Sequence, residues 1–466
     1  MTELCFTPAR RLARMIRARK VSATEVTKAF IAQIERVNPK VNALVTFLPE
    51  QALKAAKALD RKRSNAPLAG LPIAYKDLVP TKGIRTTFGS SIYADHVPAE
   101  DHAIVERLSA AGAITIGKTN TPEFGAGSQT FNAVFGATRN PYDLSKTCGG
   151  SSGGAAVAVA CGMLPFADGS DLAASLRNPA NFCNVVGFRP TPGRVPGWPA
   201  TNAWQTLSTL GPIGRTAEDT AFLLSAMAGP DPRAPVSIAE PGSLFGRPLK
   251  RSFRKARVAW SRDLGGLPMD ARVTGVLEPQ RKTFQQLGCV VEDAAPDLSA
   301  ATEAFHTLRA LGFLDRLPLL RKHRDKLKDT VIWNIEQGLK LTGEDIARAQ
   351  DLRTQVFHRM RTFLERYDFL VCPVNQVPPF SVDEPYPAEI AGVRLDNYID
   401  WMKSCYWITT TSHPAVSVPA GFTREGLPVG LQIVGRYRDD LGVLQLAHAF
   451  EQATGYWKKR PDAASA

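Results

Sequence analysis

The chain has 466 residues, of which 44% are hydrophobic and 22% charged, and its formal net charge is +13. No stretch reaches the roughly 18 apolar residues of a membrane-spanning helix, and residues 1–30 lack the apolar run and cleavage site of a secretory signal. Seven single cysteines without a C-x-x-C pattern argue against a disulfide framework or a zinc site. We therefore expect a cytoplasmic protein that makes no contact with a membrane.

Two helices are predicted first, and over residues 70–190 the predicted helices and strands then alternate. Ser22 and Glu25 form a capping-box pattern, which indicates the start of a helix, and apolar residues then recur at helical spacing. The predicted helices are 22–37, 49–63, 99–112 and 154–163, and the predicted strands are 72–76, 113–117 and 164–168. This alternation favours an α/β sandwich with a partly parallel sheet.

The segment 236–400 differs from the preceding residues in its sequence pattern: it has proline-rich stretches with a long helical region between them. Strand-like sequence returns at 411–435, and no flexible linker is visible. We predict a single domain over 1–466. Its core would comprise roughly 65–235 and 405–460, and 236–400 would form a variable covering layer.

A glycine- and serine-rich loop at 149–154 is the densest chemical signal. Glycine permits positive φ and close backbone approach, so a tight structural turn is one interpretation. Phosphate binding is another, but no lysine follows the loop as in a Walker A motif and no strand precedes it as in a Rossmann fingerprint. Gly150, Ser152 and Gly154 also fit the G-x-S-x-G of an α/β-hydrolase. That fold needs a preceding apolar strand and a downstream catalytic histidine, whereas His413 precedes a strand-like run and suggests a structural residue.

A third chemical interpretation combines serine with lysine. A serine hydroxyl is a weak nucleophile and needs a neighbouring base, and a lysine can be that base only when it is uncharged. Burial lowers the pKa of a lysine toward neutrality. Lys76 ends the apolar strand PIAYK, so its stem would lie in the core. The opposing interpretation is a lysine that extends its charged end to the surface.

These residues lie in blocks that resemble the amidase signature family over most of the chain. The family implies one large α/β/α domain around a mixed, twisted sheet, with no cofactor and no metal. The blocks are GLPIAYKD at 70–77, TNTPEFGAGS at 119–128, FGATRNPYD at 135–143, GGSSGG at 149–154, GSDLAASLRNPANFCNVVGFRPTPGRVP at 169–196, YDFLVCP at 367–373, and HPAVSVPAGF with GLPVGLQIVG within 413–435.

The resemblance implies a Ser–Ser–Lys triad. Lys76 would be the base, Ser151 the bridging residue after a cis peptide bond, and Ser175 the nucleophile that forms an acyl-enzyme. The resemblance further implies that backbone N–H groups of Leu172, Ala173, Ala174 and Ser175 form the oxyanion hole. It also implies that Ser152, Asp171 and Arg177 support the site, and that Gly125, Ala126, Gly127 and Ser128 bind substrate.

One feature departs from the family, which usually has two glycines before the nucleophile where this chain has Ala173 and Ala174. Alanine disfavours positive φ. Either the loop does not need that conformation, or the oxyanion hole is shaped differently and the methyl groups narrow the acyl pocket. The expected reaction type is unaffected, whereas the rate and the substrate range depend on the outcome.

The resemblance implies hydrolysis of a small-molecule amide, and a homodimer is possible. Aromatic residues would favour an aryl or apolar amide if they line the pocket, although each fits the core as well: Phe131, Trp204, Phe305, Phe313, Trp333, Trp401 and Tyr406. The main alternative is the glutaminase component (the A component) of a glutamyl-tRNA amidotransferase, which usually keeps the two glycines.

Basic clusters at 247–262 and 321–328 lack aromatic residues for base stacking. We interpret these clusters as solvent-exposed faces of an enzyme and expect no nucleic-acid partner. The alternative function is that of a non-catalytic basic binding protein.

Overall fold

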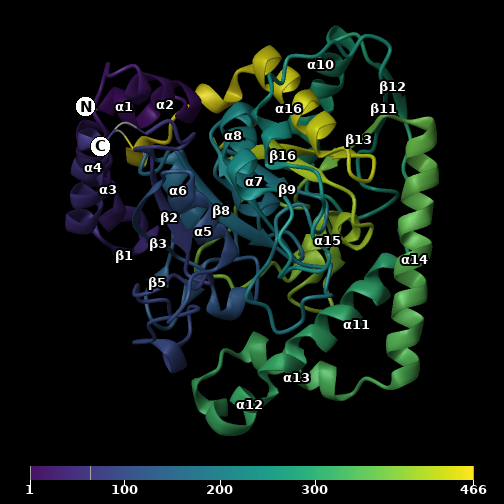
Figure 1. The fold of residues 1–466 in the computed structure, drawn as a ribbon. Helices are drawn as coiled ribbons and strands as arrows, with labels where there is room; N and C mark the ends of the chain where they lie inside the picture. The colour runs from purple at the N-terminus through teal and green to yellow at the C-terminus, as the bar shows by residue number, and fades with distance from the viewer. Residues whose placement is uncertain (1, 63, 465–466) are drawn as a thin grey trace.

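An eight-stranded mixed sheet forms the centre of the computed structural model, which describes residues 2–62 and 64–464 (Figure 1). The strands are β8 (Phe166–Asp171), β9 (Val186–Arg189), β10 (Thr209–Gly214), β11 (Arg257–Trp260), β12 (Val290–Asp293), β13 (Phe369–Pro373), β16 (Ala415–Phe422) and β17 (Pro428–Gly435). Their order is β12-β11-β13-β17-β16-β9-β10-β8. Strand β11 pairs in parallel with β12 and β13, and the other neighbours pair antiparallel.

A smaller sheet of three strands lies beside β8, at the edge of the large sheet. Its order is β1-β3-β2, with β1 (Leu44–Phe47), β3 (Ile114–Thr119) and β2 (Pro72–Lys76). Strands β2 and β3 are parallel, as the sequence predicts for this region. Short two-stranded ladders are formed by β4 (Phe131–Asn132) with β5 (Gly136–Ala137), β6 (Arg139–Asn140) with β7 (Asp143–Thr147), and β14 (Glu389–Ile390) with β15 (Val393–Arg394).

Sixteen α-helices surround these sheets in the described residues. They are α1 (Thr2–Phe6), α2 (Ala9–Arg17), α3 (Ala23–Val41), α4 (Pro49–Arg61), α5 (Ala103–Ala110), α6 (Gly153–Ala160), α7 (Arg177–Phe182), α8 (Ala217–Met227), α9 (Ala271–Leu277), α10 (Arg281–Gln286), α11 (Ala301–Phe313), α12 (Leu317–His323), α13 (Asp329–Leu339), α14 (Gly343–Arg366), α15 (Lys403–Thr410) and α16 (Asp440–Thr454). The capping box predicted at Ser22 and Glu25 is present at the start of α3. Residue 63, the last of the predicted helix 49–63, lies outside the described residues.

Helices cover both faces of the large sheet because successive side chains of a strand point to opposite faces. Phe188 and Val416 pack in the same cluster as α8 and α16, whereas Ala415 and Val434 pack with α14 and α15. Helix α6 is buried throughout and shares a third cluster with both sheets. The fold is therefore the α/β/α arrangement around a mixed sheet that the sequence predicts.

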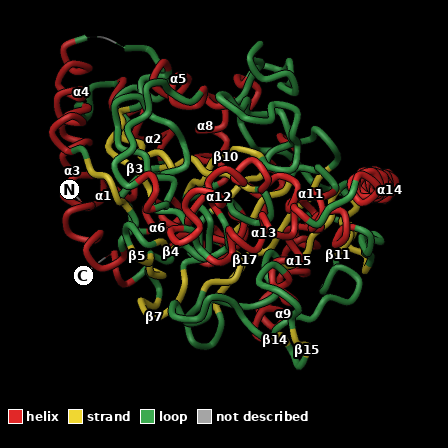
Figure 2. The backbone as a smooth tube through the Cα atoms, turned by 90° about the horizontal axis from the view of Figure 1, so that it is seen from below, coloured by secondary structure: helices red, strands yellow, loops and turns green. Residues whose placement is uncertain are grey.

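The segment 236–400 contributes to the sheet as well as covering it. Its helices α11 to α14 form the lower and right margins in Figure 1, and Figure 2 shows α14 end-on at one margin with α3 and α4 at the opposite one. Three strands of the segment, β11, β12 and β13, belong to the large sheet. The boundary between core and covering layer therefore differs from the predicted one. The reason is that β11 and β12 have four residues each and are surrounded by longer helical sequence.

Candidate active site

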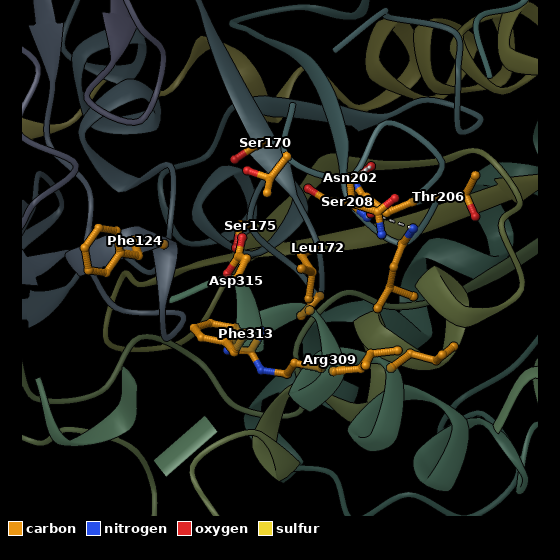
Figure 3. Close-up of a pocket in the computed structure, with 18 of the residues that line it drawn as sticks. Phe124, Ser170, Leu172, Ser175, Asn202, Thr206, Ser208, Arg309, Phe313 and Asp315 are labelled. Atoms are coloured by element: carbon orange, nitrogen blue, oxygen red, sulfur yellow. Dashed lines mark hydrogen bonds between the residues drawn. The ribbon is translucent and has the colours of Figure 1, made fainter. Parts of the chain in front are cut away.

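A cavity of about 780 Å³ opens where the two sheets meet. Its walls come from segments that are far apart in the sequence: residues 124–127, 170–175 and 200–208, and helices α11 and α14. Figure 3 shows Ser175 facing the space between these walls, with Leu172, Phe313 and Asp315 drawn around it among the lining residues. The apolar part of the lining comprises Leu78, Phe124, Leu172, Ala173, Ala200, Trp204, Leu207, Leu308, Leu311, Phe313 and Met402.

Lys76, the last residue of β2, is fully buried against this cavity. Every residue of its strand PIAYK is buried, so the lysine side chain starts from a backbone that lies in the core. The lysine Nζ lies 2.7 Å from Ser151 Oγ, 2.9 Å from Ser152 Oγ and 3.1 Å from Ser170 Oγ. The amine is therefore held by three hydroxyl groups, and two of them, Ser151 and Ser170, line the cavity.

Burial lowers the pKa of Lys76 to about 7, and the carboxylates of Asp168 and Asp171 oppose this by raising it. Removing an ammonium group from water disfavours its charged form, whereas nearby negative charges favour it. A pKa close to neutrality leaves a substantial fraction of the amine uncharged at physiological pH. Lys76 can therefore accept a proton from a neighbouring hydroxyl.

The glycine- and serine-rich loop supplies two of these hydroxyls. The Gly150–Ser151 peptide bond is cis, and the carbonyl of Gly150 accepts a hydrogen bond from Ser128 Oγ at 2.8 Å. Glycine is required at the start of α6, because a Cβ on Gly153 would collide with Thr130 Oγ1 and one on Gly154 with the backbone of residue 120. The glycines of this loop thus allow close packing at the start of α6, and its serines Ser151 and Ser152 contact the lysine.

Ser175 lies between β8 and α7 and lines the same cavity as Ser151 and Ser170. It is 8% exposed, so its hydroxyl is reachable from the cavity. The Ser175 carbonyl accepts a hydrogen bond from the N–H of Ser152 at 3.2 Å, which ties the two serine-bearing segments together. Within the described residues, Lys76 and Ser151 are in hydrogen-bond contact, and no hydrogen bond joins the Ser151 and Ser175 hydroxyls.

The turn from Asp171 to Arg177 is closed by a buried ion pair. Arg177 Nη2 lies 3.0 Å from Asp171 Oδ1, and Arg177 Nε donates to Asp171 Oδ2 at 3.0 Å. The N–H of Leu176 donates to the same carboxylate, and Arg177 also binds the carbonyl of Ala173. Burial raises the pKa of Asp171, but the guanidinium groups of Arg177 and Arg189 outweigh it and hold that pKa below its ordinary value. The ion pair between Asp171 and Arg177 thus holds the turn in one conformation.

The backbone N–H groups of Leu172, Ala173, Ala174 and Ser175 donate no hydrogen bond to any described residue. Leu172, Ala173 and Ser175 line the cavity, whereas Ala174 does not. Neither alanine has a positive φ in the described backbone. The first alternative raised by the sequence therefore holds: the turn does not need a left-handed conformation at the two positions where glycine is usual.

A family model described as Amidase matches residues 25–444 of the chain. The chain belongs to the amidase family. An acylamidase of Rhodococcus erythropolis is 36% identical over 99% of this chain and 98% of its own length. The glutamyl-tRNA(Gln) amidotransferase A component of Geobacillus kaustophilus (strain HTA426) is 35% identical over 96% and 97%. The crystal structure of a bacterial aryl acylamidase of the amidase signature family matches with a TM-score of 0.91 and 30% identity over 97% of this chain and 98% of that one. Together these findings support hydrolysis of a carbon–nitrogen bond.

The residues expected to bind substrate in this amidase separate into two groups. Gly125 and Gly127 line the large cavity. Ala126 instead packs in an apolar cluster with α13, and Ser128 is buried and holds the backbone of the serine loop. The sequence assigns all four to substrate, whereas in the structure only the two glycines face the cavity.

Two of the seven aromatic residues singled out from the sequence, Trp204 and Phe313, line the cavity of this amidase. Trp204 is 74% exposed, so it stands at the mouth. Phe305 and Tyr406 stack on each other in the core, with ring centroids 4.4 Å apart. The remaining three, Phe131, Trp333 and Trp401, do not line the cavity either. His413 is buried beside the Thr411 carbonyl, as expected for a structural histidine.

Sequence reasoning missed two polar residues next to the lysine, Asp168 and Ser170. Both lie on β8, which runs three residues beyond the predicted end at 168. Because side chains two apart in a strand point to the same face, Asp168 and Ser170 both face Lys76. The polar residues two apart in FADGSD could have placed both side chains on one face of a longer strand, although not next to Lys76.

No described helix is long and apolar enough to span a membrane.

Proposed function

We propose that this chain is an amidase that hydrolyses a carboxamide through an acyl-enzyme on Ser175. The observation that carries the proposal is a buried lysine whose pKa is lowered to about 7 and whose Nζ lies 2.7 Å from Ser151 Oγ at the wall of a cavity. A serine needs such a base to become a nucleophile. In this proposal Lys76 is the base, Ser151 the relay and Ser175 the nucleophile.

The reaction proceeds in two halves. Uncharged Lys76 takes the proton of Ser151, Ser151 takes that of Ser175, and the Ser175 oxygen attacks the amide carbonyl. The tetrahedral intermediate collapses as the proton returns along the same path to the leaving nitrogen, so the carbon–nitrogen bond breaks and the amine departs. Water then attacks the ester with the same proton route, which releases the carboxylic acid and restores the serine.

The turn 171–177 provides the electrostatic part of the mechanism. The N–H groups of Leu172, Ala173 and Ser175 are free of other partners among the described residues and border the cavity. Donors of this kind stabilise the negative charge that develops on the carbonyl oxygen, typically by several kcal/mol. Asp171 and Arg177 hold the turn in shape, and Ser152 helps to orient the amine.

We further propose that the substrate is an aryl or apolar amide. The side chains of Leu172, Phe313 and Met402 make part of the cavity lining apolar, beside the charged Arg309, Asp315 and Arg316, and an apolar surface favours an apolar group of the ligand. The likeness to an acylamidase and to an aryl acylamidase points in the same direction. The second candidate is an amidotransferase A component that releases ammonia from glutamine, which a relative at 35% identity favours.

The test uses the purified chain, a panel of anilides, aliphatic carboxamides and glutamine, and a fluorophosphonate that labels activated serines. We expect hydrolysis of anilides without any partner protein and labelling at Ser175. The variant Ser175→Ala should keep the fold and lose both signals. Ser417→Ala is the control, because Ser417 is a buried serine of β16 outside the cavity. Full turnover by Ser175→Ala would overturn the proposal, and activity on glutamine alone would favour the second candidate.

A further inference from the structure

Asp168 connects the two sheets at the point where Lys76 is held. It lies on β8, the edge strand of the large sheet, and β2 is the edge strand of the small one. The N–H of Lys76 donates to Asp168 Oδ1 at 3.0 Å. A side-chain carboxylate therefore takes the place that a strand carbonyl would occupy in a continuous sheet, and it fixes the backbone of the lysine itself.

The same carboxylate is fully buried, and its second oxygen, Oδ2, has no hydrogen-bond partner among the described residues. A buried, incompletely paired carboxylate is costly unless its charge is used or compensated. Burial raises the pKa of Asp168, while the Lys76 N–H and the ammonium groups of Lys118 and Lys76 lower it and so favour the ionised carboxylate.

Charged and titratable groups face this carboxylate from two strands of the small sheet. Lys76 and Tyr75 come from β2, and Lys118 comes from β3. Lys118 is itself buried, is held by Thr81 Oγ1 at 2.8 Å, and also faces Asp77 and Asp101. Neither lysine lines the cavity, but Lys76 contacts Ser151 and Ser170, which do, so of the two lysines Lys76 is the one connected to the cavity.

The chemistry of the proposed reaction gives this arrangement a use. When Lys76 takes a proton, an ammonium ion forms at a buried position, and burial alone would make the amine a very weak base. A fixed negative charge beside it stabilises the ammonium in the step where it forms. Asp168 provides such a charge and, through its other oxygen, holds the strand that carries the lysine.

We propose that Asp168 is a positioning residue for Lys76: it anchors the lysine backbone across the boundary between the sheets and keeps the buried amine basic enough to take the serine proton. This inference rests on the proposed function. It concerns a residue that touches neither the cavity nor the substrate and acts through the lysine alone.

The experiment compares the wild-type chain with Asp168→Asn, which keeps an oxygen for the Lys76 N–H and removes the charge. Asp168→Ala is made in parallel, because the buried amide of Asp168→Asn can itself hinder folding. A folded form of either variant is sufficient for the test. The readouts are kcat/KM for an anilide and the rate of fluorophosphonate labelling at Ser175, from about pH 5 to about pH 9. The control is Asp219→Asn, which removes a buried carboxylate on α8 whose pKa burial also raises to about 6.

In the wild type, activity should rise with pH through about 7 as Lys76 loses its proton. Loss of the Asp168 charge should move this rise to lower pH by about one unit, the effect of a nearby opposite charge, and should lower the alkaline plateau. Asp219→Asn should leave the rise in place. Folded Asp168 variants that label at Ser175 with a wild-type profile would overturn the inference while the proposed function stands. Failure of the wild type to label or hydrolyse would overturn both.

Discussion

Replacing Lys76 with methionine separates the chemical role of the lysine from its structural one. Methionine fills a similar volume without an amine, so turnover should disappear. The effect on stability follows from the buried charge. The pKa of Lys76 falls from 10.5 to about 7, and each pKa unit corresponds to about 1.4 kcal/mol. The protonated amine would therefore destabilise the folded chain by about 5 kcal/mol. At pH 7, where about half of the folded amine is uncharged, the net cost is about 4 kcal/mol.

The hydrogen bonds of the amine act in the opposite direction. Lys76 contacts three serine hydroxyls, and each bond contributes about 1 kcal/mol. The variant should therefore be about as stable as the wild type near pH 7. Because the folded pKa is lower than the unfolded one, the unfolded chain binds the extra proton between about pH 7 and 10, and wild-type stability gains with pH across that window. The difference in free energy of unfolding between wild type and variant should thus shift in favour of the wild type by about 3 to 4 kcal/mol between about pH 7 and pH 10.

The assay is denaturant unfolding, followed by tryptophan fluorescence, of both proteins at several pH values between about 7 and 10. The quantity of interest is the difference between their free energies of unfolding. Lys57→Met, which removes an exposed lysine of α4, is the control for the loss of one positive charge. Parallel stability curves for the wild type and Lys76→Met across this window would refute the reasoning, because they would mean that Lys76 keeps its proton when the chain folds.

Two further substitutions test the turn and the mouth of the cavity. Arg177→Met leaves the buried carboxylate of Asp171 with Arg189 as its remaining ion-pair partner among the described residues, so we expect a loss of about 3 to 5 kcal/mol in the free energy of unfolding. Arg272→Met, in an exposed pair, should cost about 1 kcal/mol or less, and equal losses in the two variants would contradict this account. Trp204→Ala should raise KM for anilides by up to about tenfold with kcat nearly unchanged, and an unaltered KM would remove Trp204 from the binding surface.

Local features of the fold were predictable because they depend on neighbouring residues. The strand 72–76 matches β2 residue for residue, and the cap at Ser22 is present. Burial of Lys76 followed from the apolar run before it. The sheet order was not predictable, because β11 pairs with β13 more than a hundred residues later. The short sequence RVAW gives no sign of that partner.

Some residues of the candidate site were likewise predictable from local sequence, and others were not. Lys76 and the serine loop were recognisable as blocks of sequence, and the structure joins the lysine to Ser151. The contacts of Ser170 and Asp168 with the lysine depend on how one sheet edge meets another, which no local pattern encodes. Helices α11 and α14 form a wall of the cavity although their sequence gives no hint of it.

The origin of the cavity walls has a consequence for how such enzymes diversify. The reacting groups come from residues 76–175, whereas much of the opposite wall comes from the loop 200–208 and from helices α11 and α14. Because these two sources are separate stretches of chain, the second can be exchanged as a block if the packing of Phe305 on α11 with Ala173 and Ala174 is kept. Transplanting α11–α14 between homologues is therefore a direct route to hybrid enzymes that keep their chemistry and acquire a new preference for the group they cleave.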